Sequence, residues 1–389
     1  MITQLQIKNF KALKDVNLKF DRLNLVIGPN ASGKTTLLKA CELVTLVPTT
    51  ALAAEIDSWP NDERVSTSGA ESAVQISADF LNIQLSIWFN DLNRQQRRAD
   101  WGWLQTRAQG FGGVIDYGGQ VRLPDGQFHH TPTGAPRVIG LVEQYRPKAQ
   151  LLRFDPEVLR SPAKNDTANP TVASDGTGLA AVLADIAASD SETFATVQSA
   201  LRSVIKSFTR LSVPKAEFDN TTYRKIKISS VDEPTFVRDT GKAVGYKLRF
   251  GFGDQPLISA SSVSEGTLLS LALVTVMAQR NPPNLILVDE LERGLHPRAL
   301  ADLVTQLRRL LEIYPELQII ATTHSPYLAD CFKAEEIILT ALHPDGHSVV
   351  GHLSEHPEYD RWKDEMAPGE FWTSVGEQWL VDDKPGTSA

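Results

Sequence analysis

The eight residues from Gly28 to Thr35, Gly-Pro-Asn-Ala-Ser-Gly-Lys-Thr, constrain the fold of this chain more than any other stretch. The mostly apolar run from Leu23 to Ile27 predicts a buried strand before them, and the apolar spacing from Lys34 to Val44 predicts a helix after them. A strand, a G-x-x-x-x-G-K-[ST] turn and a helix in this order are typical of a loop that binds nucleotide phosphates. An ordinary strand-to-helix turn is the alternative that these flanks disfavour.

Each part of this loop has a chemical reason. Gly28 and Gly33 let the backbone turn and present N–H groups to phosphate oxygens, and the helix N-terminus adds partial positive charge. Lys34 is expected to reach the β- and γ-phosphates, and Thr35 to ligate Mg²⁺. The predicted nucleotide-binding residues are Gly28, Pro29, Asn30, Ala31, Ser32, Gly33, Lys34, Thr35 and Thr36.

The composition is that of a globular protein with a core. Of 389 residues, 42% are hydrophobic and 22% charged, and the net charge of −8 argues against a generally basic surface that binds nucleic acid. The longest apolar run, Leu268 to Ala278, is too short to span a bilayer, and the first residues do not have the plan of a signal peptide. We therefore expect a cytoplasmic protein without a membrane partner.

The pattern along the chain predicts three parts. Residues 1–157 hold the phosphate-binding loop and alternating runs, such as 74–80 and 83–89, that predict an antiparallel β subdomain. Residues 158–260 mix two helices, predicted at 179–186 and 191–208, with short strands, and they carry a basic region from Lys206 to Lys227. Residues 261–389 alternate long helices with apolar strands, which indicates a mostly parallel sheet flanked by helices, so the fold class is α/β.

Two of these apolar strands end in residues with catalytic potential. Leu285 to Val288 leads into Asp289 and Glu290, which places both carboxylates at the carboxyl end of a buried strand. Asp289 is the expected Mg²⁺ partner, and Glu290 is placed to orient and deprotonate an attacking water. A second strand, Leu317 to Ala321, leads to His324, which we interpret as a contact of the γ-phosphate or its water rather than a purely structural histidine.

The order of these motifs resembles the ABC-type ATPases. The matching segments are Gly28–Thr35, Ser264–Thr267, Asp289–Glu290 with Gly294–Pro297, and Thr323–Ser325. Within that group, the chain resembles the soluble branch of RecF, SMC and OLD-like proteins, and most of all the predicted bacterial AAA-family ATPases with an ABC-type head. Segments 7–11, 152–156, 175–179, 369–372 and 376–379 are also similar to that group, so the resemblance covers nearly the whole chain.

The resemblance implies ATP hydrolysis by a dimer. Ser264 and Gly266 match the signature motif, which in this family binds the γ-phosphate held by a second subunit, so two heads enclose two ATP molecules. Glu290 and His324 match the catalytic glutamate and the switch histidine, with Lys34 as the third catalytic residue, and residues 292–296 resemble the loop that crosses the dimer interface. Without the other motifs, Ser264 would be interpreted as a helix N-cap.

The family also implies partners and leaves alternatives. The expected role is a switch that controls a separately encoded nuclease or toxin, or DNA, in DNA repair or defence against phage and plasmids. The glutamine of the family's Q-loop is not assigned, because Gln144 and Gln150 both fall in the expected region. The alternatives are a scaffold that binds ATP with little turnover and, less favoured, the ATPase subunit of a transporter.

Overall fold

The structure is a computed structural model of the chain. It describes the backbone of residues 1–46, 74–80, 83–89, 103–106, 113–116, 120–122, 128–130, 146–164, 167–226 and 235–382. Side chains are described in the ranges 1–46, 74–80, 146–164, 167–218 and 241–382. Within these ranges no helix combines the length and the apolar character needed to cross a membrane.

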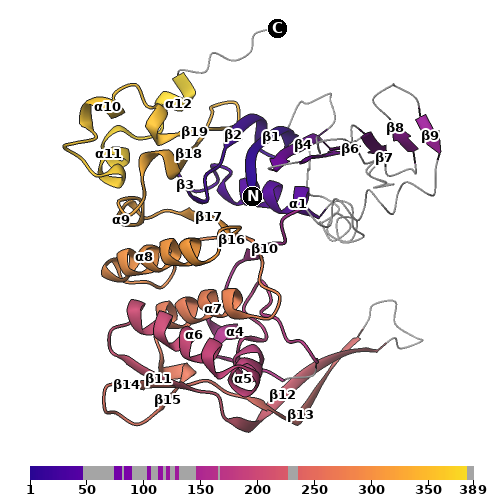
Figure 1. The fold of residues 1–389 in the computed structure, drawn as a ribbon, viewed down its shortest axis with the longest axis vertical. Helices are drawn as coiled ribbons and strands as arrows, with labels where there is room; N and C mark the ends of the chain where they lie inside the picture. The colour runs from indigo at the N-terminus through magenta and orange to yellow at the C-terminus, as the bar shows by residue number, and fades with distance from the viewer. Residues whose placement is uncertain are drawn as a thin grey trace. The chain divides into compact units, whose positions relative to one another are not determined.

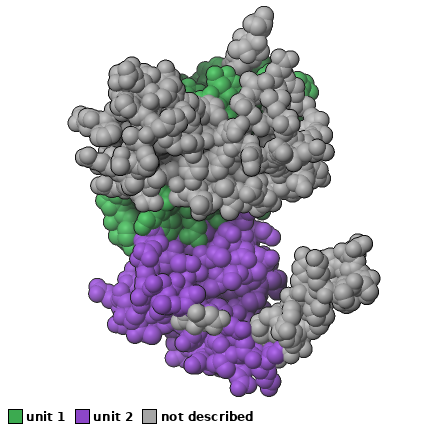
Figure 2. Space-filling model, turned by 90° about the vertical axis from the view of Figure 1, so that its right-hand side faces the viewer, with its two compact units in different colours: residues 1–151, 283–292, 307–389 green, residues 152–282, 293–306 purple. Residues whose placement is uncertain are grey.

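The chain forms two compact units, coloured green and purple in Figure 2. Unit 1 consists of residues 1–151, 283–292 and 307–389, and unit 2 consists of residues 152–282 and 293–306. Each unit is therefore assembled from segments that are distant in sequence. The three-part division inferred from the sequence stays a prediction.

Unit 1 is built on one large sheet with a parallel centre (Figure 1). The strand order is β10-β16-β17-β3-β18-β19-β2-β1-β4-β5-β6-β7-β8-β9. The central pairs β16–β17, β17–β3 and β3–β18 are parallel, whereas β18–β19 and the pairs from β2 to β9 are antiparallel. The parallel strands are β3 (Leu23–Ile27), β16 (Leu285–Val288), β17 (Gln318–Thr323) and β18 (Ile337–Leu342).

The remaining strands of this sheet extend it on both sides. They are β1 (Ile2–Phe10), β2 (Leu13–Lys19), β4 (Val74–Phe80), β5 (Ile83–Phe89), β6 (Trp103–Thr106), β7 (Gly113–Asp116), β8 (Gln120–Arg122), β9 (Phe128–His130), β10 (Ala149–Leu152) and β19 (Ser348–His352). Every residue of β3, β16 and β17 is buried, as expected for the centre of a parallel sheet.

A buried glutamine ties the first strand to this centre. The Gln318 side chain accepts a hydrogen bond from the Ile2 N–H (2.8 Å) and donates to the carbonyls of Ile2 and Asp21 (both 2.8 Å). Because an unpaired buried amide would cost about 1–3 kcal/mol, these three bonds explain how a polar residue is accommodated at 0% exposure.

The helices of unit 1 include α1, which begins at the phosphate-binding loop, and a C-terminal group. In Figure 1 the group α10–α12, in yellow, lies beside β18 and β19. The helices are α1 (Lys34–Thr45), α9 (Pro326–Ala329), α10 (Tyr359–Trp362), α11 (Pro368–Val375) and α12 (Trp379–Asp382). Helix α8 (Pro297–Ile313) begins in unit 2 and ends in unit 1.

Unit 2 packs helices around the buried helix α7 and also carries a long two-stranded ribbon, β12–β13. Helix α7 has apolar residues all round and few exposed ones, and α4, α5 and α6 contact it. The helices are α4 (Pro156–Arg160), α5 (Leu179–Ser189), α6 (Ser191–Val204) and α7 (Glu265–Ala278). The strands are β11 (Phe208–Ser212), β12 (Lys215–Ile226), β13 (Thr235–Tyr246), β14 (Arg249–Phe252) and β15 (Ile258–Ser259).

The α/β class with a parallel sheet core is confirmed, and the strand predicted at 285–288 has the predicted bounds. The helix predicted over 191–208 is too long, since α6 ends at Val204. Phe208 begins β11 instead, where its ring makes edge contacts with Phe250 (6.5 Å) and Phe252 (6.3 Å). The apolar spacing typical of a helix extended as far as Phe208 because Phe208, although it lies in a strand, is also buried.

Candidate nucleotide-binding site

The loop from Gly28 to Gly33 joins the buried strand β3 to helix α1 in unit 1. Gly33 occupies the N-cap of α1 with φ of 98° and offers no side chain to the first-turn N–H groups. Ala31 also has a positive φ of 61°, which is uncommon for a residue with a side chain. An uncapped helix N-terminus beside a tightly turned loop is a suitable site for a phosphate group.

Strands β18 and β19 pack against the back of this loop. A Cβ atom at Gly28 would lie 2.2 Å from the carbonyl oxygen of Thr340, and one at Gly33 would lie 2.6 Å from Ser348 Oγ. Ser32 Oγ is 2.5 Å from Thr340 Oγ1 and donates to the Pro29 carbonyl at 2.8 Å. Both glycines are therefore required by close approach, and the Thr340 hydroxyl of β18 holds Ser32 of the loop in place.

Lys34 is folded back onto the loop. Its ammonium donates to the carbonyls of Gly28 (2.9 Å) and Pro29 (2.6 Å), and the residue is only 6% exposed. Burial lowers the pKa of Lys34, and four carboxylates oppose this shift: Asp289, Glu292, Glu290 and Glu377. The ammonium is thus close to the acidic groups at the ends of the neighbouring strands and to a glutamate of the C-terminal segment.

Thr35 and Asp289 meet at the expected metal position. Thr35 Oγ1 lies 3.2 Å and 3.1 Å from the two carboxylate oxygens of Asp289, and Thr322 Oγ1 donates to Asp289 Oδ1 at 2.7 Å. Adjacent oxygen ligands of an octahedral Mg²⁺, each about 2.1 Å from the ion, lie about 3.0 Å apart. A hydroxyl and a carboxylate at this separation fit two neighbouring ligands of Mg²⁺, with Thr322 orienting the carboxylate.

Glu290 and His324 lie at the ends of adjacent strands. The Glu290 N–H donates to Thr322 Oγ1 at 2.8 Å, and Glu290 has a positive φ of 58°. The His324 N–H donates to Glu292 Oε1 at 2.7 Å, while Glu292 Oε2 is buried without a hydrogen-bond partner among the described residues. Two carboxylate residues and the histidine are therefore held on the loops that follow β16 and β17.

The predicted signature residues lie in unit 2. Ser264 caps α7 by accepting a hydrogen bond from the Thr267 N–H at 3.4 Å, so the N-cap interpretation describes its geometry. A Cβ atom at Gly266 would lie 2.7 Å from the carbonyl oxygen of Gly294 and 2.6 Å from a methyl carbon of Leu295. The start of α7 is thus packed tightly on the loop that resembles a dimer-interface loop.

Comparisons with known proteins agree with this arrangement. The model described as an AAA ATPase domain matches residues 1–97, and the model described as an AAA domain, putative AbiEii toxin, Type IV TA system, matches residues 169–330. The OLD nuclease of Thermus scotoductus is 48% identical over 44 residues, which are 11% of this chain and 8% of that protein. The chain is thus similar to AAA ATPase domains over these two segments and, over a short segment, to an OLD nuclease.

Other relatives match this chain over similarly short segments. Septu protein PtuA of Bacillus thuringiensis is 38% identical over 69 residues, 18% of this chain and 17% of that protein. RecF of Bacillus cytotoxicus is 36% identical over 64 residues, 16% of this chain and 17% of that protein. The matches therefore span less than a fifth of each of these three relatives.

A solved structure matches the chain over most of its length. The crystal structure of an SMC head bound to the C-winged-helix domain of ScpA covers 92% of this chain and 99% of that chain. Its TM-score is 0.53 at 14% sequence identity. This likeness shows the fold, an SMC-head-like P-loop architecture.

Several contacts at the candidate nucleotide-binding site were not anticipated from the sequence. Thr322, Thr340 and Glu292 hold neighbouring groups by hydrogen bonds, and the charge of Glu377 acts on Lys34. Thr322 immediately follows a predicted apolar strand, and this position could have marked it as a residue of the site. Thr340 is a single polar residue within a later apolar strand. Of the two Q-loop candidates, Gln150 lies in β10 and Gln144 lies outside the described residues.

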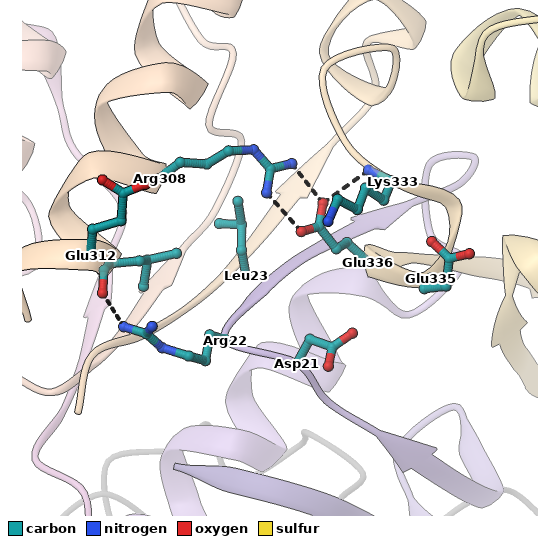
Figure 3. Close-up of a pocket in the computed structure, with 9 residues that line it drawn as sticks. Asp21, Arg22, Leu23, Arg308, Glu312, Lys333, Glu335 and Glu336 are labelled. Atoms are coloured by element: carbon teal, nitrogen blue, oxygen red, sulfur yellow. Dashed lines mark hydrogen bonds and ion pairs between the residues drawn. The ribbon is translucent and has the colours of Figure 1, made fainter. Parts of the chain in front are cut away.

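A separate cavity of about 610 Å³ lies at the other end of β3, where Leu23 begins the strand (Figure 3). Arg308 makes two 2.7 Å bonds to the carboxylate of Glu336, and the Arg22 guanidinium donates to carbonyls at the end of α8. Arg308 and Glu336 are therefore paired with each other, Arg22 is bonded to the backbone, and the cavity is distinct from the nucleotide-binding loop.

The basic region of unit 2 is only partly covered by the described side chains. Lys206, Arg210 and Lys215 are exposed, and the Lys206 ammonium lies 3.6 Å from the carboxylate of Asp302. The side chains between residues 219 and 240 lie outside the described ranges. A nucleic-acid contact in this region remains a prediction.

Proposed function

We propose that this protein hydrolyses ATP in a head-to-tail dimer and that the dimer switches an effector or a nucleic acid. The observation that carries the proposal is the meeting of Thr35 with Asp289 at the mouth of an uncapped phosphate-binding loop. Mg²⁺, when bound there, supplies positive charge to the phosphate oxygens. The Lys34 ammonium would exchange its two carbonyl partners for phosphate oxygens, which form stronger, charge-assisted bonds.

Glu290 is the proposed general base. It follows β16 directly, beside the Asp289 carboxylate, and its backbone N–H is fixed by Thr322. A carboxylate in this position accepts the proton of a water aligned with the γ-phosphate. His324, held through Glu292, is proposed to contact the same phosphate or its water.

The second half of the site is proposed to come from another copy of the chain. Ser264 and Gly266 begin α7 in unit 2, and a 14-residue helix with a small residue in its first turn can approach an anion closely. Each dimer would then hold two composite sites, each with the loop of one copy and the signature residues of the other.

A mixing experiment tests this dimer. Lys34→Ala and Ser264→Arg chains are each expected to be inactive, because one cannot hold the phosphates and the other places a bulky side chain at an exposed residue where the second copy would approach. Their mixture is expected to recover up to about a quarter of wild-type ATPase activity, since half of the dimers are mixed and each mixed dimer has one intact site. An equimolar mixture with no activity, while both variants remain folded, would reject the composite site.

The proposed setting is DNA repair or defence against phage and plasmids, because the relatives include a RecF, an OLD nuclease and Septu PtuA proteins. Control of a separately encoded nuclease or toxin, and contact with DNA, follow as proposals. ATPase rates measured without DNA, with single-stranded DNA and with duplex DNA test the proposed contact with DNA. Rates and ATP affinities that are identical with and without DNA would remove DNA from the proposal. A wild-type turnover no faster than that of Glu290→Gln would favour the alternative of a scaffold that binds ATP with little turnover.

A further inference from the structure

The turn between β18 and β19 brings three side chains together that have no role in the proposed ATPase cycle. His343 and His347 face each other across a three-residue loop, with the His343 N–H donating to the His347 carbonyl at 2.8 Å. Gly346 adopts φ of 90°, and its N–H donates to the His343 carbonyl at 2.8 Å. A hairpin of this kind, closed by a left-handed glycine, fixes the histidines as a cross-strand pair.

The donor atoms of these side chains converge. Asp345 Oδ1 lies 2.6 Å from His343 Nδ1, and the same oxygen contacts His347 Nδ1. One ligand atom from each residue lies within 4.8 Å of the others. The two imidazole rings are stacked with their centroids 4.5 Å apart and their planes 20° apart. Three groups on a five-residue turn thus point to one place.

We propose that His343, Asp345 and His347 bind one divalent transition-metal ion, with Zn²⁺ as the reference ion. Two imidazole nitrogens and one carboxylate oxygen are ligands that Zn²⁺ accepts, and a water completes four-coordination. This donor set differs from the hydroxyl and carboxylate oxygens at Thr35 and Asp289, which suit Mg²⁺. The hairpin site therefore selects a different ion from the nucleotide site.

The spacing of the donor atoms suits such an ion. With metal–ligand distances of about 2.0–2.1 Å, tetrahedral ligands lie about 3.3 Å apart, so the His343–Asp345 pair must open by less than about 1 Å. The Asp345 side chain is 52% exposed and gives an ion a route from solvent, whereas the histidine side chains are 29% and 18% exposed. Rotation of the exposed carboxylate, and of the two stacked imidazole rings so that both ring planes meet the ion, supplies the required change.

The ion would also reinforce the nucleotide site. Thr340 precedes the turn in β18 and contacts Ser32, while Ser348 follows the turn in β19 and lies against Gly33. An ion that ties the two ends of the turn holds both strands against the phosphate-binding loop. Metal binding is therefore expected to raise the melting temperature of the nucleotide-free protein.

The test uses the untagged full chain, stripped of metal and nucleotide. Titration calorimetry with Zn²⁺ is expected to give one site per chain, and Co²⁺ is expected to give visible absorption bands that Zn²⁺ abolishes. His347→Gln and Asp345→Asn should each weaken binding at least about tenfold. His296→Gln, which removes a histidine elsewhere in the chain, should leave the binding constant unchanged.

The outcomes separate this site from scattered surface histidines. Loss of the Zn²⁺-induced rise in melting temperature in the two hairpin variants, but not in His296→Gln, supports the site. Binding that persists unchanged in a His343→Gln/His347→Gln double variant would show that the ion binds elsewhere and would overturn the proposal. Circular dichroism confirms that each variant is folded, and Asp345→Asn, on an exposed turn, retains the fold if the histidine variants do not.

Discussion

Thr35 and Asp289 are 254 residues apart in sequence, yet the threonine hydroxyl lies 3.1 Å and 3.2 Å from the two oxygens of the carboxylate. The contact joins the first turn of α1 to the residue that follows β16. Strand β16 belongs to the parallel centre of the sheet, and α1 follows β3, which is also part of that centre. Thr322 Oγ1 donates to one of the same carboxylate oxygens at 2.7 Å and so fixes the orientation of the carboxylate.

This pair predicts a metal-dependent defect. Thr35→Val removes the hydroxyl at nearly constant volume and should weaken Mg²⁺-dependent ATP binding about tenfold or more, because one oxygen ligand is lost. Thr35→Ser keeps the hydroxyl and should bind like wild type. Calorimetric titration of ATP with Mg²⁺ and with EDTA checks this, and an equal loss in both conditions would contradict a role in holding the metal.

Lys34 provides a separate test of phosphate binding. Lys34→Ala should lower ATP affinity about 100-fold or more, since charge-assisted bonds contribute about 1.5–3 kcal/mol each and 1.4 kcal/mol equals a factor of ten. Burial lowers the pKa of Lys34, so wild-type affinity should begin to fall at a pH below 10.5, the ordinary lysine value. Lys39→Ala, further along α1, is the matched control and should keep the ATP affinity of wild type. An unchanged ATP affinity in Lys34→Ala would contradict the proposed phosphate-binding site.

Gly28 should be the least replaceable residue of the loop. In Gly28→Ala the new methyl group meets the Thr340 carbonyl at 2.2 Å and Thr340 Oγ1 at 2.4 Å, so β18 or the loop must shift. We expect a loss of about 1–3 kcal/mol in the free energy of unfolding, measured by urea titration. Gly241→Ala, where the methyl group meets nothing within 4 Å, should change this free energy by less than about 1 kcal/mol.

These contacts show what the sequence alone could predict. The strand β16 and the start of helix α1 can be predicted from local patterns. Four consecutive apolar residues in one case, and a glycine-rich turn in the other, leave few alternative secondary structures. The support of the loop by Thr340 and Ser348 does not, since it depends on which strands become neighbours in the sheet. Only short strands were predicted within 158–260, and the long β12–β13 ribbon was not anticipated for a related reason: its length comes from the pairing of the two strands.

The Arg308–Glu336 pair should make stability depend on acid. Burial alone raises the pKa of Glu336, but the hydrogen bonds and charge of Arg308 outweigh it, and the pKa is lowered below its usual value. The pair's contribution is therefore fully present above the unfolded glutamate pKa of about 4.3 and is lost as the pH falls through the folded value.

Glu336→Gln is expected to lower the free energy of unfolding at pH 7 by about 1–3 kcal/mol and to flatten its decline in acid. The lower part of this range is expected because the Arg308 side chain is 35% exposed. Glu335 is the exposed neighbour of Glu336, so Glu335→Gln should leave both the free energy of unfolding at pH 7 and its decline in acid unchanged. Equal acid sensitivity of wild type and Glu336→Gln, measured by urea titrations from pH 7 to pH 3.5, would exclude the pair as its source.

The backbone at Glu290 permits a last prediction that separates stability from chemistry. Its φ of 58° is in the left-handed region, which costs a residue with a Cβ atom about 1–2 kcal/mol relative to glycine. Glycine loses about 0.5–1 kcal/mol more backbone entropy on folding, so Glu290→Gly should be more stable than Glu290→Ala by up to about 1.5 kcal/mol. At an ordinary position the order is reversed. Both variants should lose ATPase activity equally, because neither retains the carboxylate; urea titrations and phosphate-release assays on the two proteins measure these effects independently.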